Sequence, residues 1–283
     1  MDLMIALLFL GITVSTPTDT LVEVRQGDHL VIRDFQGTVH VEAWERSAFR
    51  AEVETKESVP FRIERAGRNL ELRMAEGWRR NRGEDLRLIL PTWMDLEIQG
   101  RELEAEIMDL AGDVTVRSLQ GDLSFRNMSG RVEAYTVEGS IDALRLTGTA
   151  RFRSGDDDLW VGSSSAELEL ETVDGDMRLE GIDARRVSAR TTDGEIEFSG
   201  RVLPEGDYAF FSHSGDIVLR LAPPVDLDAT MLTYDGEFES EFRVMARGFR
   251  SGEGLEFTLG SGGARLVMET FDGEIKLLRG SLE

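Results

Sequence analysis

The chain has 283 residues, with 54 acidic and 32 basic side chains and a formal net charge of -22. A surface this acidic repels phosphate backbones and anionic lipid headgroups, which argues against nucleic acid as a partner. The chain has no cysteine, which excludes disulfides, thiolate metal sites and cysteine nucleophiles.

The first predicted element is an apolar segment at residues 3–14, followed by a short polar stretch at 15–18. It has the length of a signal-peptide hydrophobic region and is too short for a membrane span. Asp2 stands where a basic residue is typical and no A-x-A site follows, so a buried N-terminal strand and an uncleaved anchor are the alternatives. We expect residues 1–20 to be a signal peptide and the protein to be exported to the periplasm, cell envelope or exterior. We expect no membrane span beyond this segment.

Residues 21–91 show alternating apolar and polar side chains, which predict strands with one buried face. The expected strands are 29–35, 38–44, 49–55, 61–65, 69–74 and 85–90. A basic loop at 77–83 interrupts them. We interpret this region as a cap that closes one end of the structure that follows, because an open ladder edge invites pairing with other chains.

Residues 92–283 are organised by a nine-residue period. Glycines recur at every ninth position, with apolar residues at the second and fourth positions after each, and the register persists where a glycine is replaced. The glycines that start this pattern are Gly112, Gly121, Gly130, Gly139 and Gly148. Small insertions then shift the period, and the largest, at 247–254, is the expected excursion from the repeat.

Each repeat is a short strand plus a turn, which predicts an all-β solenoid of nine-residue units. A meander of hairpins is the competing fold, because hairpins use the same turn dipeptides. Two repeats per coil would form a flattened solenoid with two sheets, which we favour, and three would form a triangular one. Buried side chains are expected at Leu123, Phe125, Met177, Leu179, Ile196, Phe198, Ile217 and Leu219.

We expect the structural turns at seven glycines, two of them already named, and most of the seven are preceded by Asp or Ser. We expect glycine there because a tight corner demands a positive φ. These glycines are Gly121, Gly139, Gly175, Gly194, Gly215, Gly236 and Gly273.

The repeats also carry a family resemblance. TVDGDMRLEG at 172–181, TTDGEIEFSG at 191–200 and APPVDLDAT at 222–230 resemble the bacterial putative-adhesin family of β-strand-repeat proteins, also labelled a domain of unknown function. DFQGTVHVEAWE at 34–45 resembles the N-terminal unit of that family, so the resemblance spans residue 21 to the end. The resemblance implies a β-solenoid with an exported, structural or adhesive role, and it carries no catalytic residues.

Catalytic chemistry finds little support in the sequence. His29, His40 and His213 lie on different repeats without a zinc-binding motif, so neither a metal site nor a catalytic triad is indicated. The carboxylates recur at turns along the whole repeat, whereas a glycosidase needs two that converge in a cleft. No dinucleotide or phosphate-binding loop is present, and no cofactor is expected.

Two weaker possibilities remain open from the residues alone. Asp156, Asp157 and Asp158 form the densest carboxylate run and are candidate calcium ligands, although the G-G-x-G-x-D pattern of calcium-binding β-rolls is absent. Trp44, Trp78, Trp93 and Trp160 could stack on sugars but are more typical of packing. We therefore expect a non-enzymatic binding module for a protein or glycan surface, with a carbohydrate-active or calcium-binding solenoid as the alternative.

Overall fold

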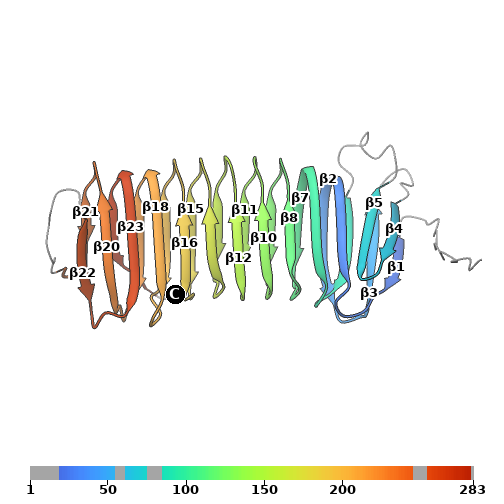
Figure 1. The fold of residues 1–283 in the computed structure, drawn as a ribbon, viewed down its shortest axis with the longest axis horizontal. Coiled ribbons are helices and arrows are strands. Elements are labelled where there is room, and N and C mark those ends of the chain that lie inside the picture. The colour runs from blue at the N-terminus through green and yellow to red at the C-terminus, as the bar shows by residue number, and fades with distance from the viewer. Residues whose placement is uncertain (1–18, 55–60, 75–84, 245–253, 282–283) are drawn as a thin grey trace, which may run out of the picture.

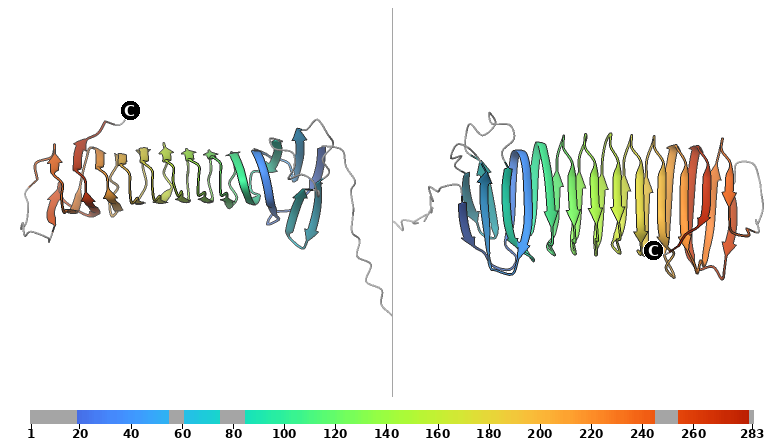
Figure 2. Two further views of the ribbon diagram at one scale, coloured as in Figure 1. Left: turned by 90° about the horizontal axis from the view of Figure 1, so that it is seen from above. Right: turned by 180° about the vertical axis from the view of Figure 1, so that it is seen from behind.

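The computed structural model describes residues 19–54, 61–74, 85–244 and 254–281. These residues form 24 β-strands that stack into an elongated rod with two layers (Figures 1 and 2). The described residues contain no helix of a length and apolarity that would cross a bilayer. The predicted all-β solenoid is confirmed. The predicted signal segment up to residue 18, the basic loop at 77–83 and the excursion at 247–253 lie outside the described residues.

Each coil of the rod contains two strands and, in the regular central part, 18 residues. Val132 pairs in parallel with Val114 on one side and Ala150 on the other, and Ile141 pairs in the same way with Leu123. Neighbouring strands are therefore equivalent repeats from successive coils. Parallel pairing excludes the hairpin meander for this part of the chain, because hairpin strands are antiparallel.

The two strands of each coil belong to opposite layers, which we call face A and face B. From the N-terminal end of the rod, face A contains β4 (Phe61–Ala66), β5 (Asn69–Met74), the first half of β2 (His29–Trp44), the first half of β7 (Asp95–Met108), β8 (Val114–Arg117), β10 (Arg131–Tyr135), β12 (Thr149–Arg153), β14 (Glu167–Glu171), β16 (Arg186–Arg190), β18 (Asp207–Ser214), β23 (Ala264–Asp272), β20 (Leu227–Thr233) and β22 (Leu255–Leu259). Face B contains β1 (Asp19–Glu23), β3 (Ala48–Glu54), β6 (Asp85–Pro91), the second halves of β2 and β7, β9 (Leu123–Arg126), β11 (Ile141–Leu144), β13 (Leu159–Gly162), β15 (Met177–Ile182), β17 (Ile196–Arg201), β19 (Ile217–Ala222), β24 (Ile275–Arg279) and β21 (Phe238–Ser240).

A single hydrophobic core runs between the two faces. The eight side chains predicted to point inward are all buried, because alternate residues of a strand point to the same side. Aromatic rings from different coils and opposite faces contact one another inside this core: Phe125 stacks on Phe152 with ring centroids 5.6 Å apart, and Phe198 lies 5.3 Å from Phe210.

The N-terminal region differs from the predicted cap. The predicted strands at 29–35 and 38–44 are one strand, β2, which crosses from face A to face B and forms a coil of the stack. Leu30 pairs with Leu70 on one side and Leu96 on the other. The coil at 29–44 therefore lies between the coil at 69–91 and the coil at 95–108, and its pairing crosses the expected boundary at residue 92.

The C-terminal end repeats this arrangement. Leu266 of β23 pairs with Tyr208 of β18 and with Ala229 of β20, although β23 follows both strands in the sequence. The last coil, β23 and β24, is thus inserted between the coil of β18 and β19 and the coil of β20 and β21. Stacking order and chain order differ at both ends of the rod.

Along the upper rim in Figure 1, the chain turns from face A to face B in four-residue turns, most of which end in glycine, and we call this rim the glycine edge. From the coil of β8 to the C-terminal end of the rod, the first residue of each turn is Ser or Thr. Ser212 Oγ donates to the Gly194 carbonyl oxygen at 3.0 Å, and Thr270 Oγ1 donates to that of Gly215 at 3.0 Å. The buried members of this row are Ser118, Thr136, Ser154, Thr172, Thr191, Ser212 and Thr270. These hydroxyls join neighbouring coils.

The seven predicted turn glycines stack in one column on the glycine edge, with Asp157 filling the position in one coil. A Cβ added at any of the seven would lie closer than 3.0 Å to a backbone carbonyl oxygen of the adjacent coil. Among the seven, positive φ occurs only at Gly121, Gly139 and Gly215, so our expectation of positive φ is wrong for the other four. Close approach between coils is the shared reason for glycine.

Candidate binding surfaces

The three candidate calcium ligands lie on the glycine edge, where they are exposed and contact the backbone of other coils. Asp157 accepts a hydrogen bond from the Gly139 N–H at 2.7 Å, and Asp158 accepts one from the Asp176 N–H at 2.8 Å. Across the described residues, no group of three or more His, Asp or Glu side chains is arranged to hold a metal ion. Two of these three carboxylates therefore act as caps for backbone N–H groups of neighbouring coils.

The three histidines do not come together. His29 lies 3.6 Å from Glu97 on face A, and His40 lies 3.1 Å from Glu106 on face B. His213 is on the glycine edge, where its ring stacks on Phe271 with centroids 5.1 Å apart.

The described tryptophans are also scattered. Trp44 donates from Nε1 to the Ala48 carbonyl at 2.6 Å, Trp160 donates to Glu180 at 3.1 Å, and Trp93 packs against the core. Trp78 lies outside the described residues. These indole groups have separate roles in packing and hydrogen bonding.

The glycine edge carries exposed apolar side chains at the second position of many of its turns, directly after the hydroxyl residue, and Gly155, Thr192 and His213 occupy that position in the other turns from β8 onward. Leu119 is 45% exposed, Val173 53%, Phe271 49% and Tyr234 58%, although large apolar side chains are usually buried. In the last three coils His213, Phe271 and Tyr234 form a continuous stack, with the Phe271 and Tyr234 centroids 5.2 Å apart. This is an exposed apolar stripe along one side of the rod.

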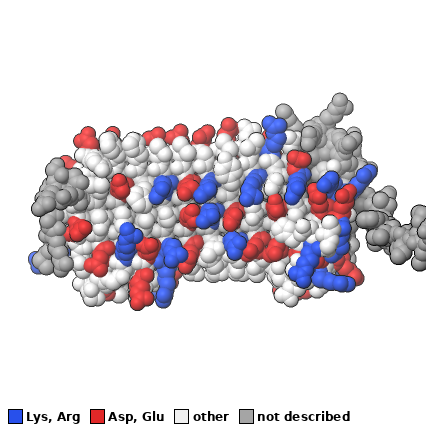
Figure 3. Space-filling view, viewed as in Figure 1, with Lys and Arg blue, Asp and Glu red and all other residues white. Residues whose placement is uncertain are grey.

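Two rows of carboxylates accompany the apolar row on the side toward face B. One is at the third position of the turn and the other directly follows the glycine column. The third-position carboxylates are Glu102, Glu138, Asp156, Asp174, Asp193, Asp272 and Asp235, and the second row contains Asp122, Asp158, Asp176, Glu195, Asp216, Glu274 and Glu237. Figure 3 shows acidic side chains following the upper rim of the rod.

The second acidic row also helps to join the coils. Asp176 accepts the Glu195 N–H at 2.8 Å, and Asp216 accepts the Glu274 N–H at 2.8 Å. Burial, together with the nearby charges of Glu197, Asp216 and Asp176, raises the pKa of Glu195 above its ordinary value. The row therefore contains mutual repulsion at neutral pH.

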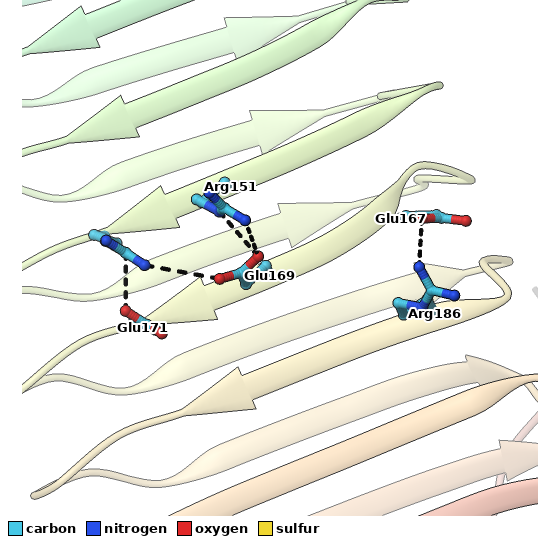
Figure 4. Close-up of polar contacts among 6 residues, drawn as sticks. Arg151, Glu167, Glu169, Glu171 and Arg186 are labelled. Atoms are coloured by element: carbon cyan, nitrogen blue, oxygen red, sulfur yellow. Dashed lines mark hydrogen bonds and ion pairs between the residues drawn. The ribbon is translucent and has the colours of Figure 1, made fainter.

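Face A presents a different arrangement, in which charges of opposite sign alternate from coil to coil (Figure 4). Arg151 contacts Glu169 at 2.6 Å, and Arg186 contacts Glu167 at 3.2 Å across the next pair of strands. A shallow hollow of about 350 Å³ lies over this ladder. Its carboxylates are engaged by arginines along the surface of the sheet.

A second hollow of about 520 Å³ lies on the glycine edge itself. It is lined by residues of the second and third turn positions and by residues of the N-terminal coils, including Arg101, Leu119, Gln120, Val137 and Glu138. The apolar row and the third-position row thus meet in a hollowed surface toward the N-terminal end of the rod.

A comparison with protein-family models identifies the family of the chain. The model of the Toastrack DUF4097 family matches residues 27–278. The chain belongs to the Toastrack family. A crystal structure from Clostridium sporogenes ATCC 15579, described as a "putative cell adhesion protein", is similar at 11% identity, with 93% of this chain and 100% of that chain covered and a TM-score of 0.23. No curated protein matches the chain.

Our sequence reasoning missed the apolar row of this Toastrack chain. It placed glycine, mostly preceded by Asp or Ser, in the turn but did not examine the residue two positions before the glycine. The signal was present, because Leu119, Val137, Val173, Phe271 and Tyr234 all occupy that position and fall outside the alternation of the strands. An apolar residue in a solvent-facing turn, recurring at the same repeat position, indicates a surface selected for contact.

Proposed function

We propose that this chain is a non-enzymatic, exported binding module that presents the glycine edge to an extended protein or glycan partner. One observation carries the proposal: partly or fully exposed apolar side chains recur at a single turn position in five of the eight coils from β8 to the C-terminal end of the rod, with Gly155 and Thr192 interrupting the row. Recurrent exposed apolar side chains on a soluble surface mark an interaction site. A rod built of stacked coils offers that site as a long stripe, which suits a partner that is itself extended.

The arrangement of carboxylates supports a non-enzymatic role. Acid and base catalysis on a glycosidic bond needs two carboxyl groups facing each other across the scissile bond. Here the acidic side chains follow the rod in rows, and those over the face A hollow, such as Glu167 and Glu169, are held by Arg186 and Arg151. The two carboxylates that line the hollow on the glycine edge, Glu102 and Glu138, belong to the same row and lie on one side of that hollow.

Export is supported by the apolar segment at residues 3–14, which precedes the solenoid. A protein held together by stacked ladders and buried hydroxyls needs no disulfide outside the cytoplasm. Mass spectrometry of the N-terminus of the protein recovered from the periplasm, envelope or medium tests this part. A chain that stays in the cytoplasm with Met1 intact contradicts it.

The binding role is tested by incubating the full chain with a panel of soluble polysaccharides and of envelope proteins and measuring both retention and cleavage. We expect retention without turnover, and a loss of retention in the double variant Phe271→Ser and Tyr234→Ser, whose side chains are exposed and can be replaced without opening the core. The matched control is Leu21→Ser, a side chain that is 61% exposed but lies on β1 at the far end. Turnover that disappears when Asp156, Asp157 and Asp158 are replaced together would overturn the proposal.

A further inference from the structure

We infer that the partner of the glycine edge is an extended cationic polypeptide. This inference rests on the proposed binding role of that edge and adds the chemistry of the ligand. It follows from three features of the described surface: where the charge is left without cations, how the aromatic rings are turned, and how long the apolar row is.

The negative charge of the rod is not spread evenly. On the two faces, carboxylates pair with arginines of neighbouring coils, as in Arg153 with Glu171 at 2.8 Å and Arg178 with Glu197 at 3.1 Å. On the glycine edge, within the described residues, no carboxylate of the third-position row makes an ion pair with a Lys or Arg. In the second row, Lys276 reaches Glu274 at 2.5 Å and Asp216 at 3.9 Å.

One arginine, Arg101, lies on the edge itself, where it lines the hollow beside two carboxylates of the third-position row. In the coils that follow, the arginines nearest to the edge end the strands of face A. Arg153 is held by Glu171, and Arg190 lies over the Phe211 ring with its guanidinium carbon 4.8 Å from the ring centroid. Arg117 occupies the corresponding position on β8. The arginines that end these strands lie on the opposite side of the apolar row from both acidic rows, so beyond the coil of Arg101 the acidic rows have few cations beside them. The edge therefore attracts positive charge along its length.

The aromatic stack favours a polypeptide over a glycan. Sugars are recognised by the open flat faces of aromatic rings, whereas here the ring planes face one another: His213 and Phe271 are inclined by 21°, and Phe271 and Tyr234 by 31°. The surface thus offers ring edges and the aliphatic side chains of Leu119, Val137 and Val173, which suit aliphatic side chains of a peptide. Acidic polysaccharides would be repelled by the carboxylate rows.

The dimensions suit an extended chain of moderate length. The row from Leu119 to Tyr234 spans eight coils. The seven steps between these coils, at about 4.8 Å each, give a length of roughly 34 Å. An extended peptide advances about 3.3 Å per residue, so about ten residues span the row. Alternate side chains of such a peptide are about 6.6 Å apart and do not match the coil spacing. Recognition then depends on composition, basic and apolar side chains in alternation, more than on one sequence.

The test uses the full-length protein and a fluorescent peptide of about ten residues that alternates lysine with valine, with blocked ends. We expect saturable binding by fluorescence anisotropy that weakens as salt is raised, because the attraction is between exposed charges. The triple variant Asp174→Asn, Asp193→Asn and Asp272→Asn should bind about tenfold more weakly. The double variant Phe271→Ser and Tyr234→Ser should also bind more weakly, and circular dichroism confirms that each variant retains its strands.

The matched control is the triple variant Glu42→Gln, Glu45→Gln and Glu64→Gln, which removes the same charge from exposed positions away from the glycine edge. It should bind the peptide within about twofold of the unmodified chain, because charges beyond a Debye length of about 8 Å are screened. Equal losses in both triple variants would mean that net charge alone attracts the peptide, and would overturn the inference.

Two other results would also overturn it: equal binding of a glutamate–valine peptide, or a peptide affinity unchanged by the three asparagine substitutions. Failure of this inference is distinguishable from failure of the proposed function. If a neutral glycan or an acidic protein binds and is lost in the Phe271 and Tyr234 variant, the edge is a binding site with a different partner. If no member of the panel or peptide binds, the binding role itself is wrong.

Discussion

The buried hydroxyl row makes a quantitative prediction at Ser212. This side chain is 6% exposed and donates to the Gly194 carbonyl oxygen at 3.0 Å. The substitution Ser212→Ala removes the hydroxyl and leaves that carbonyl without its donor in a buried corner. An unsatisfied buried acceptor costs about 1–3 kcal/mol. Ser212→Thr is the matched control, because Thr270 and Thr191 occupy the same position in other turns and show that the corner accommodates the methyl group.

The effect is best measured locally, because a stack of coils can open in parts instead of unfolding as a unit. Hydrogen exchange followed by mass spectrometry should show amides of 191–200 and 207–222 exchanging about 5-fold to 150-fold faster in Ser212→Ala, with 1.4 kcal/mol corresponding to tenfold. Amides of β8 and β9 lie far from Ser212 along the rod, so a change in their exchange rates would indicate that the whole protein is destabilised. Exchange in Ser212→Ala that matches the Ser212→Thr control would show that the hydroxyl contributes nothing, and would refute the ladder argument.

Four further predictions concern packing, coil spacing, charge and metal. Phe198→Ala should lower the free energy of unfolding by about 3–5 kcal/mol in denaturant titration, because the ring is fully buried beside Phe210; a loss below about 1 kcal/mol contradicts this packing. Gly194→Ala should lower the free energy of unfolding by about 1–3 kcal/mol, because the added Cβ meets the Gly175 carbonyl of the adjacent coil. The control Gly67→Asn should leave it nearly unchanged, because the space around Gly67 is open and Asn tolerates its φ of +66°. Glu195→Gln should stabilise the protein at neutral pH, and this stabilisation should fade as the pH falls toward 4.5. The reason is that the pKa of Glu195 is higher in the folded chain than in the unfolded chain, so the charged carboxylate destabilises the fold at neutral pH and the protonated carboxyl does not at low pH. A stabilisation that grows in acid contradicts this reasoning. Removal of calcium with a chelator should leave the unfolding temperature unchanged, and a large drop would establish a metal site at Asp156, Asp157 and Asp158.

The regular part of the fold was predictable because its pattern is local. Alternation places Leu123 and Phe125 on one side of a strand, and the nine-residue period repeats that strand in register, so the buried set follows from the sequence. The period alone left two or three repeats per coil open, and the pairing of residues 18 positions apart shows that the number is two. The ends were not predictable in this way. The insertion of β23 between β18 and β20 is a long-range pairing, and no local pattern at Leu266 indicates which strands lie beside it.

The candidate surface was missed for a related reason, and the turn explains why it lies where it does. In each four-residue turn the first residue is constrained by its buried hydroxyl, and the glycine is constrained by the carbonyl of the next coil. The second and third positions face solvent and make no side-chain contact that the stack requires. Residues such as Phe271 and Asp272 can therefore change without loss of the fold, and a partner can select them. A solenoid whose turns are fixed at two positions out of four leaves two rows of positions open to variation. Here one row is mostly apolar, with Gly155 and Thr192 as interruptions, and the other is mostly acidic, with Gln120 and Ser214 as interruptions. These are the rows on which recognition is proposed.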